Sequence, residues 1–520
     1  MDDKVTTLQP VTTTYDNPND HKFEQYPGTR LLVDDQHLLH AEHGSHDLVL
    51  IPPPSNDPDD PLRWSAPRKY LALGIVCLYS FIVGALTLSN GVLYGALIME
   101  FHATVDYLNT GTAVGLLLIG FSNLFWNPMA MKFGRRPAYL FSAILTTVSM
   151  IMGSVAQSKG VYNGSRMLLG FAAGPFEQLP AVTVNDQFFV HQRGFGLSMY
   201  LLACTLGSFL GPLASGFVLE SMGWRWVVRF YAIFMGMTAI IIFFWLEETG
   251  FARDIGIPSE DEPAVNFEQP VPTSKKSYLA KLRLFSNFTL RTSLLTTIFE
   301  PLKLILDPIV IWAGVIYGFA IAWLVVMSVS VNTVFQNPLY GYNFNFQEVG
   351  LTNIAPLIGG LIIIYAGGAG TDRFMVWQAR QNNGVMEPES RIYAVFLGGP
   401  IMAGGLFLYG PGAAAGLSWI APVIGMALIG AGMPIAGEVS LGYVTESYPH
   451  KAGEASAAAI IIRNIIGCCI VFASGPWIAK GLRDAFITMG SLCLFVFLSG
   501  AFMIWKGKYF RGRTARALQL

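Results

Sequence analysis

Residues 309–335 read IVIWAGVIYGFAIAWLVVMSVSVNTVF and contain no Asp, Glu, Lys or Arg. A helix that spans the hydrocarbon of a bilayer needs about 20 mostly apolar residues, so this segment by itself predicts a membrane helix. The rest of the chain agrees, because 52% of its 520 residues are hydrophobic and only 13% are charged. A soluble domain carries about 25% charged residues. The charges here are too few to cover a water-facing surface, and the sequence predicts an integral membrane protein.

Other segments meet the same criterion, and together with 309–335 they fall into two sets of six. The first set is 70–98, 107–131, 138–157, 166–189, 195–219 and 226–246. The second set is 309–335, 348–368, 392–410, 417–444, 454–479 and 485–505. This division predicts an all-α membrane protein of twelve transmembrane helices in two six-helix bundles, a repeat at the level of topology.

The polar stretches define the remaining organisation. The expected parts are a disordered cytosolic tail (1–64), a first bundle (65–250), a cytosolic linker (251–305), a second bundle (306–506) and a cytosolic tail (507–520). The linker region turns basic after Lys275, and an amphipathic helix is expected near 275–295. The first 64 residues lack a positive cluster followed by an apolar run, so we expect no cleavable signal peptide.

Orientation follows from the distribution of positive charge, because cytosolic loops are enriched in Lys and Arg. With the N-terminus inside, 23 Lys and Arg residues face the cytosol and 6 face the other side. We therefore expect both termini to be cytosolic. Asn163-Gly-Ser is a glycosylation sequon on the outer side, but its loop is very short, so we expect it to be unmodified.

The composition also excludes several classes of function. A net charge of −1 gives no reason to expect a nucleic-acid partner, and no Gly-x-x-x-x-Gly-Lys-Ser/Thr loop is present to bind ATP. His191 and His450 have no partners at metal spacing. The cysteines all lie inside apolar runs without metal-ligand spacing: Cys77, Cys204, Cys468, Cys469 and Cys493. We expect neither an enzyme nor a cofactor.

Charged residues inside a bilayer are costly, so the few present are candidates for function. Glu177 lies near the middle of the segment 166–189, and Pro175 and Pro180 flank it. Each proline removes a backbone donor and predicts a kink. A midplane carboxylate in a kinked helix is typical of a substrate or proton site. The alternative interpretation is a carboxylate held by a permanent internal partner.

Two further charges lie deep in neighbouring helices. Glu438 and Arg463 are predicted at depths that differ by roughly 5 Å, at 1.5 Å per residue, so the arginine could reach the carboxylate. They form either a neutralised structural pair or a gate that breaks during transport. Asp186 lies closer to the cytosolic end than Glu177, and we expect it to bridge to Arg135, Arg136 or Arg193. Structural coupling there is favoured over substrate contact.

Four stretches resemble the major facilitator superfamily, and the resemblance covers about residues 48–505. Between the second and third helices, Asn127-Pro-Met-Ala-Met131-Lys132-Phe133-Gly134-Arg135-Arg136 is similar to Gly-x-x-x-Asp-Arg-x-Gly-Arg-Arg, with the Gly and Asp replaced. Gly368-Ala-Gly-Thr-Asp372-Arg373 is the counterpart between the eighth and ninth. The fourth helix begins Arg166-Met-Leu-Leu-Gly170, similar to the Arg-x-x-x-Gly element of the family.

The fifth helix resembles the antiporter element of the family through Gly207-Ser-Phe-Leu-Gly211-Pro212-Leu-Ala-Ser-Gly216. The chain is therefore similar to the fungal twelve-helix drug:proton antiporter branch, and in Tyr443-Val-Thr-Glu446 and Arg463-Asn464 also to amine and polyamine carriers. The resemblance implies that Asp372 and Arg373 help gating and that Arg166 assists proton transfer, although an interfacial arginine is an equal alternative. Close helix packing alone also explains the glycines.

These observations favour a secondary transporter that exports a small organic compound in exchange for protons. The alternative within transport is uptake of an organic cation or polyamine. An alternative of another class is a membrane sensor that binds its ligand without moving it. We expect a monomer in the lipid bilayer of the plasma membrane, with the vacuolar membrane as the alternative.

Overall fold

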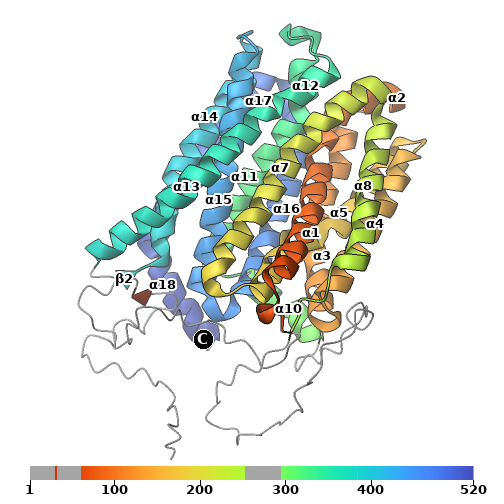
Figure 1. Cartoon of the computed structure of the whole chain (residues 1–520). Helices are drawn as coiled ribbons and strands as arrows, with labels where there is room; N and C mark the ends of the chain where they lie inside the picture. Colours follow the sequence, from red (N-terminus) through yellow and green to blue (C-terminus); the bar gives the residue numbers. More distant parts are fainter. Residues whose placement is uncertain (1–29, 32–59, 252–293, 383–384, 519–520) are drawn as a thin grey trace, which may run out of the picture.

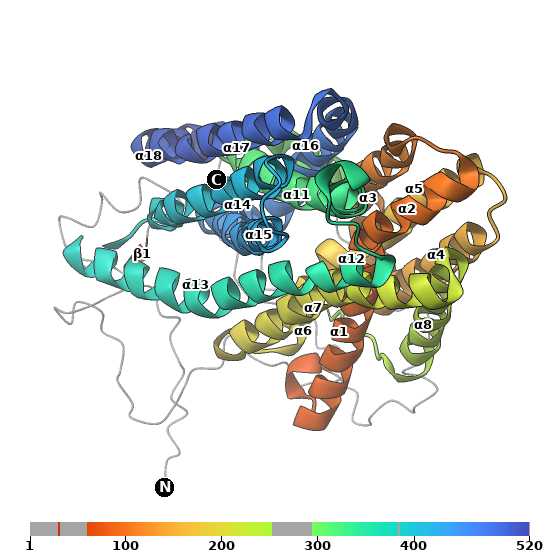
Figure 2. The same ribbon diagram turned by 90° about the horizontal axis from the view of Figure 1, so that it is seen from above.

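The computed structural model describes residues 30–31, 60–251, 294–382 and 385–518. Most of the expected tail 1–64, of the linker 251–305 and of the amphipathic helix near 275–295 lies outside the described residues. Figure 1 shows a long helical bundle, and Figure 2 shows its two halves side by side, α1 to α8 in one and α11 to α18 in the other. The expected all-α membrane fold of two bundles is confirmed.

The N-terminal half contains ten helical elements within the described residues. They are η2 (Pro61–Arg63), α1 (Ala66–Leu88), α2 (Asn90–Phe101), α3 (Val105–Phe133), α4 (Arg135–Ser154), α5 (Lys159–Ala173), η3 (Gly174–Glu177), α6 (Leu179–Gln187), α7 (Val190–Met222) and α8 (Trp224–Trp245). The described part of the linker adds α10 (Leu294–Leu304). It packs against α3 of this half and α16 of the other.

The C-terminal half begins at Pro308. Its elements are α11 (Pro308–Phe335), η4 (Pro338–Tyr340), α12 (Phe346–Thr352), α13 (Ile354–Gln381), η5 (Pro388–Ala394), α14 (Val395–Ala414), α15 (Ile420–Ser447), η6 (Pro449–Lys451), α16 (Ala452–Lys480), α17 (Leu482–Leu498) and α18 (Gly500–Leu518). A two-residue antiparallel pairing joins β1 (Arg30–Leu31) to β2 (Val385–Met386), with Arg30 opposite Met386.

Eleven helices of the described part are long and apolar enough to cross a membrane. The remaining predicted crossing, 166–189, is present as three short consecutive helices, α5, η3 and α6. Pro175 and Pro180 each lie in the first turn of a new helix there, because a proline cannot donate the hydrogen bond that would continue the preceding one. The predicted kink is thus a full break in the helix.

Two predicted helix ends fall short of the observed ones. The crossing 348–368 was expected to end near residue 368, but α13 continues to Gln381. The last crossing was expected to end near 505, but α18 continues to Leu518. The apolar run shows where a helix leaves the hydrocarbon, and neither segment contains a proline that would end the helix there.

The two ends of the bundle differ in how the halves meet. We call them the α2 end, which holds α2 and α12, and the α18 end, which holds α10 and α18 (Figure 1). At the α2 end Ser328 Oγ donates to the carbonyl of Leu88 at 2.9 Å, and Asn332 Nδ2 donates to that of Gly91 at 2.6 Å. These bonds join α11 to the junction of α1 and α2, so the halves are closed together at the α2 end.

Candidate functional site

Glu177 lies at the break in the fourth crossing, as the last residue of the short helix η3. Its side chain is 8% exposed, although the break leaves backbone carbonyls without their usual helical donors. One of them is used locally, because Tyr200 of α7 donates its hydroxyl to the carbonyl of Phe176 at 3.1 Å. The break therefore places a buried carboxylate between α3, α7 and the other half.

The partner of Glu177 is Arg463 of α16. Arg463 Nη2 donates to Glu177 Oε1, and the arginine side chain is 6% exposed. A buried charge without a partner would cost several kcal/mol, and here each charge neutralises the other. The two residues belong to different halves of the molecule, so the ion pair crosses the interface between the bundles.

Two more side chains complete the surroundings of Arg463. Asn464 accepts a hydrogen bond from Arg463 Nη2 at 3.1 Å and donates Nδ2 to Glu177 Oε2 at 3.4 Å. The guanidinium carbon lies 4.7 Å from the ring centroid of Tyr317 in α11, within the range of a cation–π interaction. We call Glu177, Tyr317, Arg463 and Asn464 the central cluster.

Polar atoms near the central cluster are buried without a hydrogen-bond partner in the described part of the chain. They are Asn123 Oδ1, Gln178 Nε2 and Arg463 Nε. Asn127 Nδ2 donates to Gln178 Oε1, which places Asn127 and Asn123, one turn apart on α3, beside η3. Buried polar groups are normally satisfied, so the region offers hydrogen-bonding capacity to a polar molecule.

The predicted pairing of Glu438 with Arg463 is wrong for this conformation. Arg391 of η5 contacts Glu438 at 3.5 Å and Glu446 at 2.6 Å, while Arg463 faces Glu177. The prediction compared the depths of Glu438 and Arg463 in the membrane. It contained no information on the directions in which their side chains point. An added Cβ on Gly442 would lie 2.9 Å from Arg391 Cδ, so the arginine runs along this face of α15.

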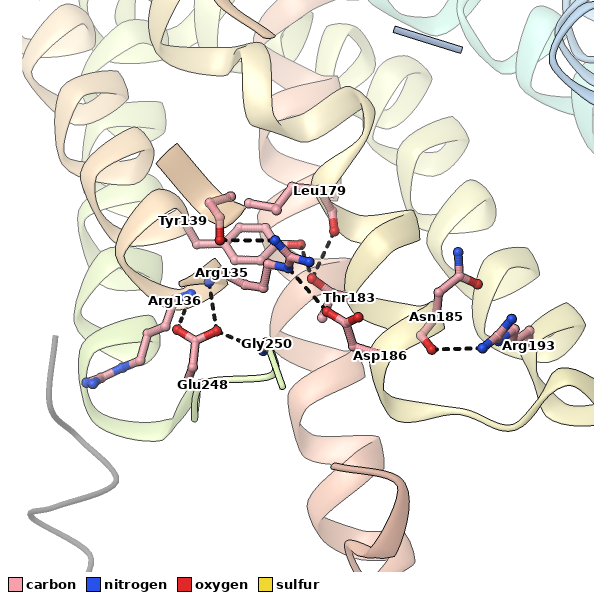
Figure 3. A network of polar contacts seen from close by, with 11 residues as sticks. Arg135, Arg136, Tyr139, Leu179, Thr183, Asn185, Asp186, Arg193, Glu248 and Gly250 are labelled. Carbon is pink, nitrogen blue, oxygen red and sulfur yellow. Dashed lines mark hydrogen bonds and ion pairs between the residues drawn. The ribbon is translucent and has the colours of Figure 1, made fainter. Parts of the chain in front are cut away.

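Three of the predicted gate residues, Arg135, Arg136 and Asp186, lie in the network of Figure 3. Arg135 Nε donates to Asp186 Oδ2 at 3.2 Å, and Arg135 Nη1 donates to the carbonyl of Ala130 at 3.0 Å. The predicted contact of Asp186 is therefore present, through Arg135. Arg193 instead donates to the carbonyls of Phe188 and Asn185. A role for this network in gating stays a prediction.

Glu248 is the part of this network that the sequence analysis missed. Its carboxylate accepts the backbone N–H groups of Arg135 at 2.7 Å, Arg136 at 3.1 Å and Gly250 at 2.8 Å (Figure 3). Burial raises the pKa of Glu248, and these three N–H groups oppose that rise. An acidic residue directly after a membrane helix was the available signal, because a carboxylate stabilises the N-terminus of a nearby helix.

Arg136, one of the expected partners of Asp186, is fully buried. Its Nη2 donates to the carbonyl of Phe243 at 2.5 Å, and its guanidinium lies 5.8 Å from the ring of that residue. It thus ties the start of α4 to the end of α8. Of the other expected gate residues, Arg373 is exposed on α13, while the side chain of Asp372 falls outside the described residues.

Arg166 lies on α5 beside a pocket lined by helices of the N-terminal half and by Val325 of α11 in the other half. Its Nη2 donates to the carbonyl of Leu86 at 3.1 Å, next to the junction of α1 and α2. The pocket is lined by Thr87, Thr112, Arg166, Gly170 and Val325 among others. Arg166 thus faces the interior of the bundle and not the lipid surface, which argues against the interfacial alternative. Its role in proton transfer stays a prediction.

The glycines of the predicted antiporter element make close helix contacts. An added Cβ would lie 2.0 Å from the carbonyl oxygen of Phe81 at Gly207, and 2.5 Å from Ala85 Cβ at Gly211. At Gly216 it would lie 2.7 Å from the carbonyl oxygen of Phe346 in the other half. Pro212 lies inside the continuous helix α7. These contacts show that the glycines allow close helix packing, which explains their presence without a role in antiport.

The sequon at Asn163 is inaccessible. Asn163 is 4% exposed, and its Nδ2, the atom that would carry a glycan, donates to the carbonyl of Tyr107 at 2.6 Å. This contact is a physical reason for the expected lack of modification, because a glycan is bulky and needs a surface position.

The family model described as Major Facilitator Superfamily matches residues 75–472. The chain belongs to the major facilitator superfamily. An uncharacterized MFS-type transporter, C1271.10c of Schizosaccharomyces pombe, is 29% identical over 95% of this chain and 94% of its own. Protein HOL1 of Saccharomyces cerevisiae is 25% identical over 94% of this chain and 96% of its own.

The fold agrees with the family. The xylose transporter XylE from E. coli, in a partially occluded inward open conformation, matches with a TM-score of 0.57 and 15% identity, over 84% of this chain and 99% of that one. The predicted superfamily is confirmed, and both sequence relatives come from fungi. The chain is a multi-pass membrane transporter of this family and not an enzyme.

Proposed function

We propose that the protein is a proton-coupled antiporter that exports a small organic compound. The observation that supports this most directly is the buried ion pair between Glu177 and Arg463, which crosses the interface between the halves. Transporters of this fold work by rocking one bundle against the other around a central site. A pair that spans the interface is made or broken by that motion, which couples a proton on Glu177 to the direction of access.

The surroundings of the pair suit a polar organic substrate. Unpartnered buried atoms of Asn123, Gln178 and Arg463 supply donors and an acceptor. The ring of Tyr317 supplies an apolar face beside the guanidinium of Arg463. Binding sites for small molecules combine such surfaces with a few placed polar groups.

The conformation and the expected orientation together correspond to one state of an alternating-access transport cycle. With both termini in the cytosol, the closed α2 end faces outward and the protein is in an inward-facing state. In this proposal the bundles 65–250 and 306–506 move relative to each other, and Asp186, Arg135, Asp372 and Arg373 contribute to the inner gate. The transporter acts as a monomer in the plasma membrane.

A second candidate function, uptake of an organic cation or polyamine, has its own supporting observation. Glu177 and Tyr317 together hold a cation, the guanidinium of Arg463. A substrate cation could take that place. Measuring the direction of substrate movement under an imposed pH gradient separates export from uptake.

The test is Glu177→Gln in proteoliposomes. A pH-sensitive dye inside the vesicles reports proton movement when rhodamine 6G, ethidium or spermidine is added outside, and the first probe that the wild type moves is kept. We expect Glu177→Gln to lose the proton movement at least tenfold while it still reaches the membrane and folds, because the amide cannot carry the proton. Glu387→Gln is the matched control, since Glu387 pairs with Lys508 at the α18 end. Unchanged proton movement in Glu177→Gln would falsify the proposal.

A further inference from the structure

We infer that Asn464 and Gly120 are positioning residues that hold the central ion pair together. This inference rests on the proposed function, in which Glu177 carries the proton. In this inference, the positions of the Glu177 and Arg463 side chains are set by an uncharged contact between α16 and α3.

Asn464 connects both members of the ion pair. It is 1% exposed, its Oδ1 accepts from Arg463 Nη2 at 3.1 Å, and its Nδ2 donates to Glu177 Oε2 at 3.4 Å. An amide offers an acceptor to a cation from its oxygen and a donor to an anion from its nitrogen at the same time, without a charge of its own. A carboxylate at this position would repel Glu177, and an apolar side chain would leave both partners short of a hydrogen bond.

Gly120 provides the space in which this amide lies. A Cβ added to Gly120 would lie 2.8 Å from Asn464 Cβ and 2.9 Å from Asn464 Nδ2. Gly120 belongs to α3 of the N-terminal half and Asn464 to α16 of the C-terminal half. The glycine therefore fixes where the amide of one half stands relative to Glu177 of the other.

A methyl group at position 120 has one direct consequence. The amide must move away, and the nearest atom that moves with it is the donor to Glu177. A carboxylate that loses a hydrogen-bond donor binds a proton more readily. The profile of transport against pH is then displaced toward higher pH.

The experiment measures that profile for Gly120→Ala, Asn464→Ala and the double variant in proteoliposomes, with the probe selected for the wild type. Gly74→Ala on α1 is the matched control, because nothing lies within 4 Å of the Cβ it would add. Thermal stability in detergent is recorded for every variant. Two single variants on opposite halves keep the test open if one of them fails to fold.

We expect Gly120→Ala and Asn464→Ala to displace the profile by about one pH unit, a tenfold change in proton affinity, and Gly74→Ala to leave it in place. In the double variant the methyl group should displace the profile no further than Asn464→Ala does, because the donor to Glu177 is already gone, although its contact with the Cβ of residue 464 remains and can lower the thermal stability. A Gly120→Ala variant that lowers the rate equally at every pH would show a packing role and overturn the inference. If instead the wild type and Glu177→Gln share one profile, it is the proposed function that fails.

Discussion

At the scale of single residues, a buried ion pair that the sequence analysis did not identify joins the last helix, α18, to η5. Arg511 of α18 donates Nε and Nη2 to the two carboxylate oxygens of Glu389, at 2.9 and 2.7 Å, and its side chain is fully buried. Tyr443 of α15 adds its hydroxyl to Glu389 at 3.5 Å. A fork of two parallel hydrogen bonds is the favoured arrangement of arginine with a carboxylate. The end of α18 is thus part of the folded C-terminal half.

We expect Arg511→Ala to destabilise the protein by about 3–5 kcal/mol, because it leaves Glu389 buried without its partner. Lys508→Ala is the comparison on the same helix. Its pair with Glu387 is half exposed, and such pairs contribute about 0–1 kcal/mol. Thermal unfolding of both variants in one detergent measures the difference. Equal losses would mean that burial does not set the strength of the Arg511 contact.

Whether a contact can be predicted from the sequence depends on how many directions are open to its side chains. The contact of Asp186 with Arg135 was predictable, because both lie where a helix meets a loop and few arrangements are open to them. The contact of Glu177 with Arg463 was not, although both residues were identified. Which way a side chain points around its helix depends on packing across two halves, and a single sequence does not record it.

At the scale of elements, the sequence predicted the number and order of the crossings better than their continuity. Twelve apolar segments were expected, and all of them are helical. The interruptions after Leu88, Thr352 and Leu498 fall at Ser89, Asn353 and Ser499 without a proline, and no local pattern marks them. The break at Pro175 and Pro180 had such a mark. Helix breaks set by tertiary contact are therefore outside the reach of pattern alone.

The second half of the broken crossing, α6, is held against α4 by polar contacts. It is tied to α4 by the contact of Asp186 with Arg135 and by hydrogen-bonded hydroxyls of Tyr139 and Thr183, 3.0 Å apart. We expect Asp186→Asn to disfavour the present conformation, closed at the α2 end, with a change in state preference of up to about tenfold for 1.4 kcal/mol. The reason is that the charged link between α6 and α4 that the substitution removes is formed in this conformation. Accessibility of introduced cysteines from each side of the membrane reports the shift.

Met131→Asp is the complementary variant. Met131 stands at the Asp position of the Gly-x-x-x-Asp-Arg-x-Gly-Arg-Arg pattern that this stretch resembles. It is 42% exposed, so a carboxylate there can approach Arg135 without a large desolvation cost. We expect it to strengthen the network and to oppose the effect of Asp186→Asn. If neither substitution alters the accessibility pattern, the network stabilises the N-terminal half and has no part in gating.

At the scale of the whole molecule, the two ends of the bundle carry different kinds of contact. The α2 end is joined through backbone groups: Ser328 and Asn332 donate to carbonyls, the N–H of Phe346 donates to Glu220, and Gly216 packs against the backbone of α12. The α18 end carries the ion pairs of Arg135, Arg391 and Arg511, each within one half. Hydrogen bonds between the halves at one end, and these ion pairs within each half at the other, agree with closure at the α2 end.

The orientation of the molecule in the membrane decides whether the closed α2 end faces the outside or the cytosol. Because Lys and Arg favour the cytosolic side, we expect the α18 end in the cytosol and the α2 end outside. In a variant whose five cysteines are replaced by serine, Leu339→Cys and Lys508→Cys supply one thiol at each end. Leu339 is 79% exposed and the Lys508 side chain 51%, so both thiols are reachable. A membrane-impermeant maleimide added to intact cells should label Leu339→Cys alone, and Lys508→Cys only after permeabilisation. The reverse pattern would turn the present conformation into an outward-facing one, and would assign the network around Asp186 to the outer gate.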